Sequence, residues 1–260
     1  MLVRDLTDRK YPFLYSDDLV TKARGIMRDR GLRTLPVLDE NKRLLGVVSR
    51  MDVMTITSSI SPIRVGGVMS SPRFVATTDM DALGVLKEMI RLDEWYVPVT
   101  VSSHDPTYTG MFGSEAFIRS SLEKDLANLS KPLSEIMSNK LLTCSPEDEV
   151  DNVWRLMRER SFAGLPVVKK GKLIGIVTQK DLLDTRAVFP SFEAKKGRFK
   201  APSKISSVMK TSVASLKPTA TVKEAADLML RKNIGRVPIV DEKGKLIGMV
   251  DREDITKALL

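Results

Sequence analysis

The chain of 260 residues has little of the chemistry that metal centres and catalytic nucleophiles need. It contains one cysteine, Cys144, and one histidine, His104. A lone cysteine excludes an internal disulfide, and so few soft ligands argue against a zinc site. Nucleophilic catalysis has neither a Cys/His pairing nor a histidine to serve as base. We therefore expect no metal, no prosthetic group and no enzymatic activity.

Long hydrophobic runs are also missing. No apolar stretch approaches the ~20 residues that span a bilayer, and the first five residues show no signal-peptide hydrophobic region. Hydrophobic residues still make up 42% of the chain, which is ample material for cores. We expect a soluble, cytoplasmic protein that does not contact a membrane, with Cys144 as a buried thiol in the strand-like segment 141–144.

One short string of residues occurs repeatedly. Residues 175–181 read as a buried strand that runs into a helix: Gly175 allows a close approach of other atoms, Thr178 stands where a helix N-cap belongs, and Asp181 follows three residues later. The string returns in full at 46–52, with an acid at the cap at 248–254, and in outline only at 110–116. The chain therefore contains four copies of one unit.

Each copy is preceded by two further markers. A short strand opening with proline begins at Pro36, Pro98, Pro166 and Pro238, and these prolines are 62, 68 and 72 residues apart. Proline is tolerated at the first residue of a strand, where no ladder hydrogen bond is donated. Before each strand, apolar residues at helical spacing predict an amphipathic helix. Such regularity predicts a repeated unit of helix, two strands and helix.

This unit resembles the CBS domain, and the resemblance covers nearly the whole chain. It implies an α/β fold in which the four repeats pair into two Bateman modules, which can stack into a flat disc. It also implies clefts that commonly hold adenosine nucleotides, as in stand-alone archaeal and bacterial CBS proteins and in the γ subunit of AMP-activated protein kinase. We expect repeats at 1–59, 65–122, 133–185 and 205–260, with the second degenerate and a linker at 186–204. A hydrophobic-Met pair before three of the repeats, as at Val68 and Met69, is expected to anchor their packing.

The repeated string could bind a nucleotide for a physical reason. A helix N-terminus attracts phosphate, and the hydroxyl of Ser49 or Thr178 would add a donor there. Asp52 and Asp181 could each accept both hydroxyls of a ribose, as an acidic residue does in dinucleotide folds. The alternative is a capping box, which explains the same two pairs without a ligand. The fixed glycine and proline positions, together with the resemblance, favour binding.

The fourth and second repeats depart from this pattern. Asp251 is a good N-cap but would repel a phosphate, although Asp254 could still hold a ribose with Arg252 or Arg236 compensating its charge. In the second repeat, Ala116 removes the ribose acceptor, so we expect that site to be empty.

Basic side chains near the string could contact phosphate. Arg50 and Lys180 stand just before Asp52 and Asp181 and could add positive charge near the phosphate. Arg33 and Arg236 stand shortly before the proline strands, where basic residues of similar CBS proteins reach a phosphate across the cleft. The alternative for Arg33 and Arg236 is a solvated helix end, which cations also favour.

The formal net charge of +9 lies entirely in the second half. Residues 1–130 hold 17 basic and 17 acidic side chains, whereas 131–260 hold 25 and 16. The linker at 186–204 carries six Lys or Arg, one acid and three phenylalanines. This composition suits single-stranded nucleic acid, a solvated linker, or a lid that adds cations to a bound polyphosphate; linker or lid is the favoured interpretation.

These features predict a non-catalytic regulatory protein. It would bind AMP, ADP or ATP between paired repeats and transmit occupancy to an effector protein, as a monomeric disc or a homodimer. The alternatives are a nucleic-acid-binding protein that uses the basic second half, and a sensor of S-adenosylmethionine, which shares the adenosine moiety.

Overall fold

A computed structural model describes residues 1–54, 61–124, 126–160, 162–185 and 203–260. The side chains of 183–185 lie outside this description, as does nearly all of the basic segment at 186–204, so the interpretations of that segment stay predictions. Among the described residues, no helix combines the length and the apolar character needed to cross a membrane.

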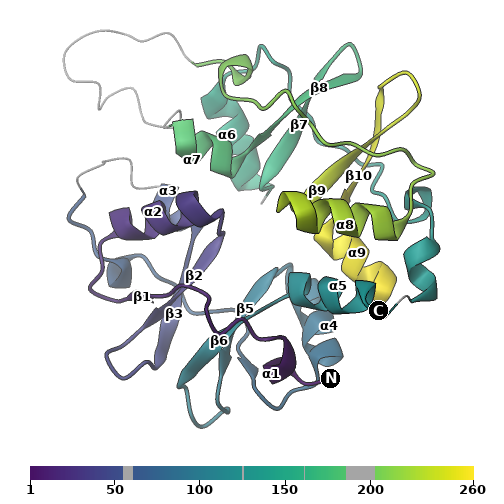
Figure 1. Ribbon diagram of the computed structural model, residues 1–260. Coiled ribbons are helices and arrows are strands. Elements are labelled where there is room, and N and C mark those ends of the chain that lie inside the picture. Colours follow the sequence, from purple (N-terminus) through teal and green to yellow (C-terminus); the bar gives the residue numbers. More distant parts are fainter. Residues whose placement is uncertain (55–60, 125, 161, 186–202) are drawn as a thin grey trace, which may run out of the picture.

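The chain forms four α/β units in sequence order, as the repeats predicted (Figure 1). The first contains α1 (Val3–Leu6), β1 (Leu14–Tyr15), α2 (Val20–Arg30), β2 (Thr34–Leu38), β3 (Leu44–Ser49) and α3 (Arg50–Met54). The second contains η1 (Val65–Gly67), β4 (Ala76–Thr77), α4 (Ala82–Leu92), β5 (Tyr96–Thr100), β6 (Tyr108–Gly113) and α5 (Ser114–Leu122). The short helix η2 (Ala127–Ser130) connects the second unit to the third. The third unit contains η3 (Leu133–Glu135), α6 (Val150–Glu159), β7 (Gly164–Lys169), β8 (Lys172–Thr178) and α7 (Gln179–Thr185). The fourth contains η5 (Ile205–Ser207), α8 (Val222–Lys232), β9 (Arg236–Val240), β10 (Leu246–Asp251) and α9 (Arg252–Leu259).

The helix ends follow local chemistry. Helix α8 begins at a complete capping box, in which the Thr221 hydroxyl accepts from the Glu224 backbone N–H and the Glu224 carboxylate accepts from the Thr221 N–H. Helix α2 ends at Gly31 in the left-handed conformation, which glycine adopts at no steric cost. The buried residues of α6 fall at helical spacing and face the core of the third unit, as the periodicity predicted.

The prediction that the strands open with proline is wrong. Strands β2, β5, β7 and β9 begin two residues earlier, and proline occupies the third position of each. In β7, Pro166 lies opposite Ile176 of β8, and its carbonyl accepts a hydrogen bond from Cys144 on the other side at 3.0 Å. The missing N–H of proline therefore faces away from the antiparallel partner, so the ladder loses no bond there. Cys144 itself is buried, as expected, and burial raises the pKa of its thiol to about 12.

Each unit is completed by a segment from its neighbour. The Val65 N–H of η1 donates to Asp18 of the first unit at 2.8 Å, and Val3 of α1 donates to Met80 of the second at 2.9 Å. In the same way, the Leu133 N–H of the third unit donates to the Ala220 carbonyl of the fourth at 2.8 Å, and the Ile205 N–H of the fourth donates to the Asp148 carbonyl of the third at 2.9 Å. Units one and two, and units three and four, are therefore interlocked as two modules.

The hydrophobic-Met pair anchors this exchange. A Cβ added to Gly46 would lie 2.8 Å from the Ser70 carbonyl oxygen and 3.2 Å from Met69 Sδ. Met209 lies over Gly175, and Met137 over Gly248, in the same way. The glycine of the repeated string is thus required by close protein packing.

The two modules surround a common centre (Figure 1). Helix α2 contacts α7, and α5 contacts α9, so the first unit faces the third and the second faces the fourth. One hydrophobic core is continuous across the second and fourth units and includes Phe117 and Ile118 with Ile255 and Leu259. The first and third units have separate cores, so the modules are joined mainly through the second and fourth units.

Replacing Gly46 with alanine should destabilise the protein by about 1–3 kcal/mol, because the added methyl group meets a backbone oxygen. Chemical denaturation monitored by circular dichroism would measure the change. Gly25, in the middle of α2, is the control, since nothing lies within 4 Å of an added Cβ there. Gly25→Ala should stabilise by about 0.5–1 kcal/mol through helix propensity. Equal effects of both substitutions would contradict the packing role of Gly46.

Candidate functional site

A cavity of about 990 Å³ lies where the four units meet. It is lined from all four units and from the segment that leads into α8. Its lining carries ten Lys or Arg side chains and three carboxylates, and is therefore strongly cationic. The basic residues are Lys10, Arg30, Arg33, Arg50, Arg119, Lys180, Lys210, Lys232, Arg236 and Arg252, and the acidic ones are Asp8, Glu115 and Asp181.

One end of the cavity contains the third-unit string. Thr178 and Asp181 stand at the junction of β8 and α7, beside a wall that includes Ile176, Val213 and Pro238. The Thr178 N–H and hydroxyl donate to Asp181 Oδ2 at 2.9 and 2.6 Å, which completes a capping box. The arrangement places an aspartate and a helix N-terminus next to apolar surface.

The other oxygen of Asp181 is held by a lysine that the sequence reasoning missed. Lys210 Nζ lies 2.8 Å from Asp181 Oδ1; the lysine side chain is 61% exposed, whereas that of Asp181 is only 3% exposed. Lys210 directly follows Met209, and the corresponding residues after the other methionines are Ser70 and Ser138. A comparison of the three residues that follow these methionines was the signal that could have identified Lys210.

Four arginines from the first and fourth units line the cavity: Arg33, Arg50, Arg236 and Arg252. Burial, together with the charges of the other three, lowers the pKa of Arg33 to about 9. Burial also lowers the pKa of Arg236, against the opposing effect of nearby acids such as Asp251. Burial therefore disfavours the charge of both arginines, and at Arg33 the neighbouring arginines add repulsion that a bound anion would relieve.

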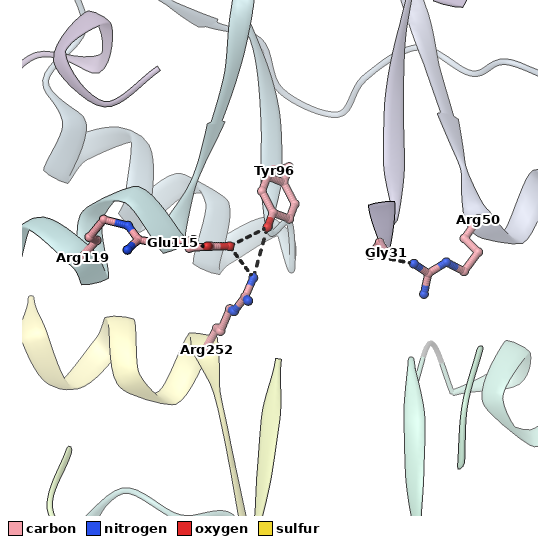
Figure 2. Close-up of polar contacts among 6 residues, drawn as sticks. All are labelled: Gly31, Arg50, Tyr96, Glu115, Arg119 and Arg252. Carbon is pink, nitrogen blue, oxygen red and sulfur yellow. Dashed lines mark hydrogen bonds and ion pairs between the residues drawn. The ribbon is translucent and has the colours of Figure 1, made fainter. Parts of the chain in front are cut away.

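Two of these arginines donate to backbone carbonyls. Arg50 Nη2 donates to the backbone carbonyl of Gly31 at 2.9 Å, at the C-terminus of α2 (Figure 2). It also donates to the carbonyl of Leu32. Arg236 Nη1 donates to the Gly164 carbonyl at 2.8 Å and so links the fourth unit to the third. Both residues therefore have a structural role in addition to lining the cavity.

The second unit fills part of the centre with its own side chains. Arg33 stacks on Trp95, with Cζ 3.7 Å from the ring centroid. Arg252 Nη1 lies 3.1 Å from Glu115 Oε2 and donates to the Tyr96 hydroxyl at 3.1 Å, so the three side chains form one cluster (Figure 2). The Tyr96 hydroxyl also donates to Glu115 at 3.3 Å. These contacts connect the second unit to the first and fourth.

The structure brings seven of the ten candidate residues to this cavity and leaves three elsewhere. Those that line it are Arg33, Arg50, Thr178, Lys180, Asp181, Arg236 and Arg252. Those that do not are Ser49, Asp52 and Asp254. Ser49 and Asp52 form the same capping box as in the third unit, with the Ser49 N–H and hydroxyl both 2.7 Å from Asp52 Oδ2. Capping, the alternative interpretation, is therefore present in both strings, and it uses one oxygen of each aspartate.

Asp254 lies in surroundings that disfavour its negative charge. It caps α9 with Asp251, and its Oδ2 accepts from the Asp251 N–H at 2.9 Å. Burial, and next the negative charge of Asp251, raise the pKa of Asp254 to about 7. A carboxyl group that tends to protonate near neutral pH is a weaker acceptor for a diol than an ionised one.

Asp254→Asn should remove a pH-dependent destabilisation. Because the pKa is raised on folding, the contribution of this carboxyl to stability is complete below pH 3.8 and is lost as the pH rises through about 7. We expect the variant to gain about 1–3 kcal/mol over the parent at pH 8 and nearly nothing at pH 4, allowing for the partial exposure of the group. Denaturant unfolding at both pH values would measure this, and a gain independent of pH would contradict the assignment.

Comparisons with known proteins agree with this architecture. The CBS domain family matches residues 3–58, 133–187 and 205–260, more than half of the chain. An uncharacterized protein of Methanocaldococcus jannaschii, MJ1426, is 32% identical over an alignment of 155 residues. The alignment covers 49% of this chain and 90% of that protein. A second protein of that organism, MJ1225, is 23% identical over 269 residues and covers 96% of this chain and 95% of its own.

The solved structure of MJ1225 shares the fold. It is described as a candidate archaeal homologue of γ-AMPK and matches with a TM-score of 0.87 at 20% identity, over all of both chains. An inosine-5′-monophosphate dehydrogenase of Korarchaeum cryptofilum is 33% identical over 131 residues, but these are only 25% of the enzyme and do not transfer its activity. The matched family, the interlocked pairs of units and the shared fold establish that this chain belongs to the CBS domain family, with its units paired as Bateman modules.

Proposed function

We propose that this protein is a non-catalytic regulator that binds AMP, ADP or ATP and transmits occupancy to an effector protein in the cytoplasm. The observation that carries the proposal is the cationic central cavity, in which a buried aspartate, a helix N-terminus and an apolar wall lie together. Each feature suits one part of a nucleotide: the wall suits adenine, Asp181 suits the ribose diol, and the arginines and lysines suit phosphate.

The charge balance of the cavity favours a phosphorylated ligand. Ten basic groups against three acidic ones leave an excess that a neutral nucleoside would not compensate. Burial first, and then the charges of the other central arginines, lower the pKa of Arg33. A phosphate chain lying among Arg33, Arg236 and Lys180 would replace that repulsion with charge-assisted hydrogen bonds.

The position of the cavity supports regulation. Its lining comes from all four units, which contact one another across the centre through pairs such as Arg33–Trp95 and Arg252–Glu115. If the ligand favours one arrangement of the modules, an effector protein that recognises this arrangement binds more tightly when the ligand is bound. The gain in affinity is limited by the difference between the ligand's affinities for the two arrangements. A monomer could complete such a centre alone, and a homodimer is the other assembly to test.

Isothermal titration with AMP, ATP and S-adenosylmethionine tests the proposal directly. We expect phosphorylated ligands to bind, and Asp181→Asn to weaken binding in the third-unit site about 10–100-fold, because a charge-assisted acceptor is lost. Asparagine retains an oxygen for the cap of α7, so folding should persist. Asp52→Asn probes the first-unit string in the same way.

Glu224→Gln is the matched control, because Glu224 completes a capping box of α8 but does not line the cavity. It should leave every affinity unchanged. A protein that binds no adenosine ligand would contradict the proposed function. Salt-dependent binding of single-stranded DNA or RNA that survives both aspartate substitutions would then support the nucleic-acid alternative.

A further inference from the structure

The ion pair between Lys210 and Asp181 has a consequence for ligand choice in the third-unit site. Asp181 is almost fully buried, and its two oxygens are held differently: the cap of α7 uses Oδ2, and Lys210 approaches Oδ1 at 2.8 Å. Oδ2 already accepts two hydrogen bonds from Thr178, so both hydroxyls of a ribose diol would have to bind Oδ1. Oδ1 has two acceptor positions, and the second hydroxyl would need the one that the Lys210 ammonium now uses.

The lysine can make this exchange because only its backbone is fixed. Lys210 and Ile176 exchange both of their backbone hydrogen bonds, at 2.8 and 2.9 Å, so the Cα is held beside β8. The side chain is 61% exposed, and four rotatable bonds separate its ammonium from the Cα. Lys210 also lines the central cavity together with Lys180 and Arg236, so a displaced ammonium remains near the other cations.

The energetic effect of the exchange depends on the ligand. Displacing the ammonium from a buried carboxylate loses an ion pair, and the diol hydroxyls restore hydrogen bonds to the carboxylate but bring no positive charge to it. Adenosine provides no anion for the released lysine, which would add to an already cationic cavity. A 5′-phosphate provides one, so the lost ion pair is replaced by a new one.

We propose that Lys210 makes the third-unit site selective for 5′-phosphorylated adenosine over adenosine, by pairing with Asp181 in the free protein and with phosphate in the complex. The proposal rests on the proposed function and adds a specificity-determining residue to it. The equivalent residue of the first-unit string is Ser70, which bridges Val47 in the same way but carries no charge. The two modules therefore differ in selectivity.

The experiment measures the ratio of the adenosine Kd to the AMP Kd in an Asp52→Asn background, so that the third-unit site dominates. Lys210→Ser installs the residue found at the equivalent position before β4, and should lower this ratio about tenfold, mainly by tightening adenosine binding. Lys210→Arg keeps the charge and should preserve selectivity for AMP. Lys22→Ser removes a different ion pair, with Lys22 Nζ 2.7 Å from Asp18 on the first unit, and should leave the ratio unchanged.

The reciprocal change, Ser70→Lys in an Asp181→Asn background, should raise the ratio at the first-unit site. An unchanged ratio in Lys210→Ser, with AMP binding intact, would overturn the role of Lys210 and leave the proposed function standing. Equal weakening of both ligands would also overturn it, because that result indicates a purely structural lysine. Absence of AMP binding in the parent protein would instead overturn the proposed function itself.

Discussion

The close approach of an exchanged segment to the glycine of each string is the constraint on which the rest of the structure depends. Met209 and the Lys210 carbonyl can lie on β8 only because Gly175 has no side chain. This contact joins the third and fourth units, and it also fixes the backbone from which Lys210 reaches Asp181. Packing and the candidate ligand chemistry therefore share one short stretch of chain.

The same constraint explains why one motif serves two purposes. Thr178 and Asp181 cap α7, and capping alone would account for their spacing. The cap engages Oδ2 of Asp181, and Oδ1 pairs with Lys210. Structural and binding interpretations of the string are therefore compatible, because they use different atoms.

The second unit illustrates how a degenerate copy can contribute to a common site. Its string has lost the aspartate, yet Gly113 and Ala116 line the cavity, and Tyr96 packs against Gly113 so closely that an added Cβ would lie 2.6 Å from the ring. Trp95 and Glu115 meanwhile contact arginines of the first and fourth units. This copy therefore contributes contacts across the centre in place of a ribose acceptor.

The sequence by itself determined the repeat and the order of its elements, because these depend on periodicities of two and 3.6 residues and on glycine at fixed positions. The pairing of the repeats was an expectation from the family resemblance. The sequence did not determine where the proline strands begin, since that depends on which side of each strand finds a partner. Tertiary structure alone decided that Thr178 and Asp181 line the central cavity while Ser49, Asp52 and Asp254 do not. It also decided that Lys210 meets Asp181, 29 residues away in the chain. The physical reason is that a segment exchanged between units places the Lys210 ammonium beside the Asp181 carboxylate. Residues so far apart in the chain share no local sequence pattern that would predict their contact.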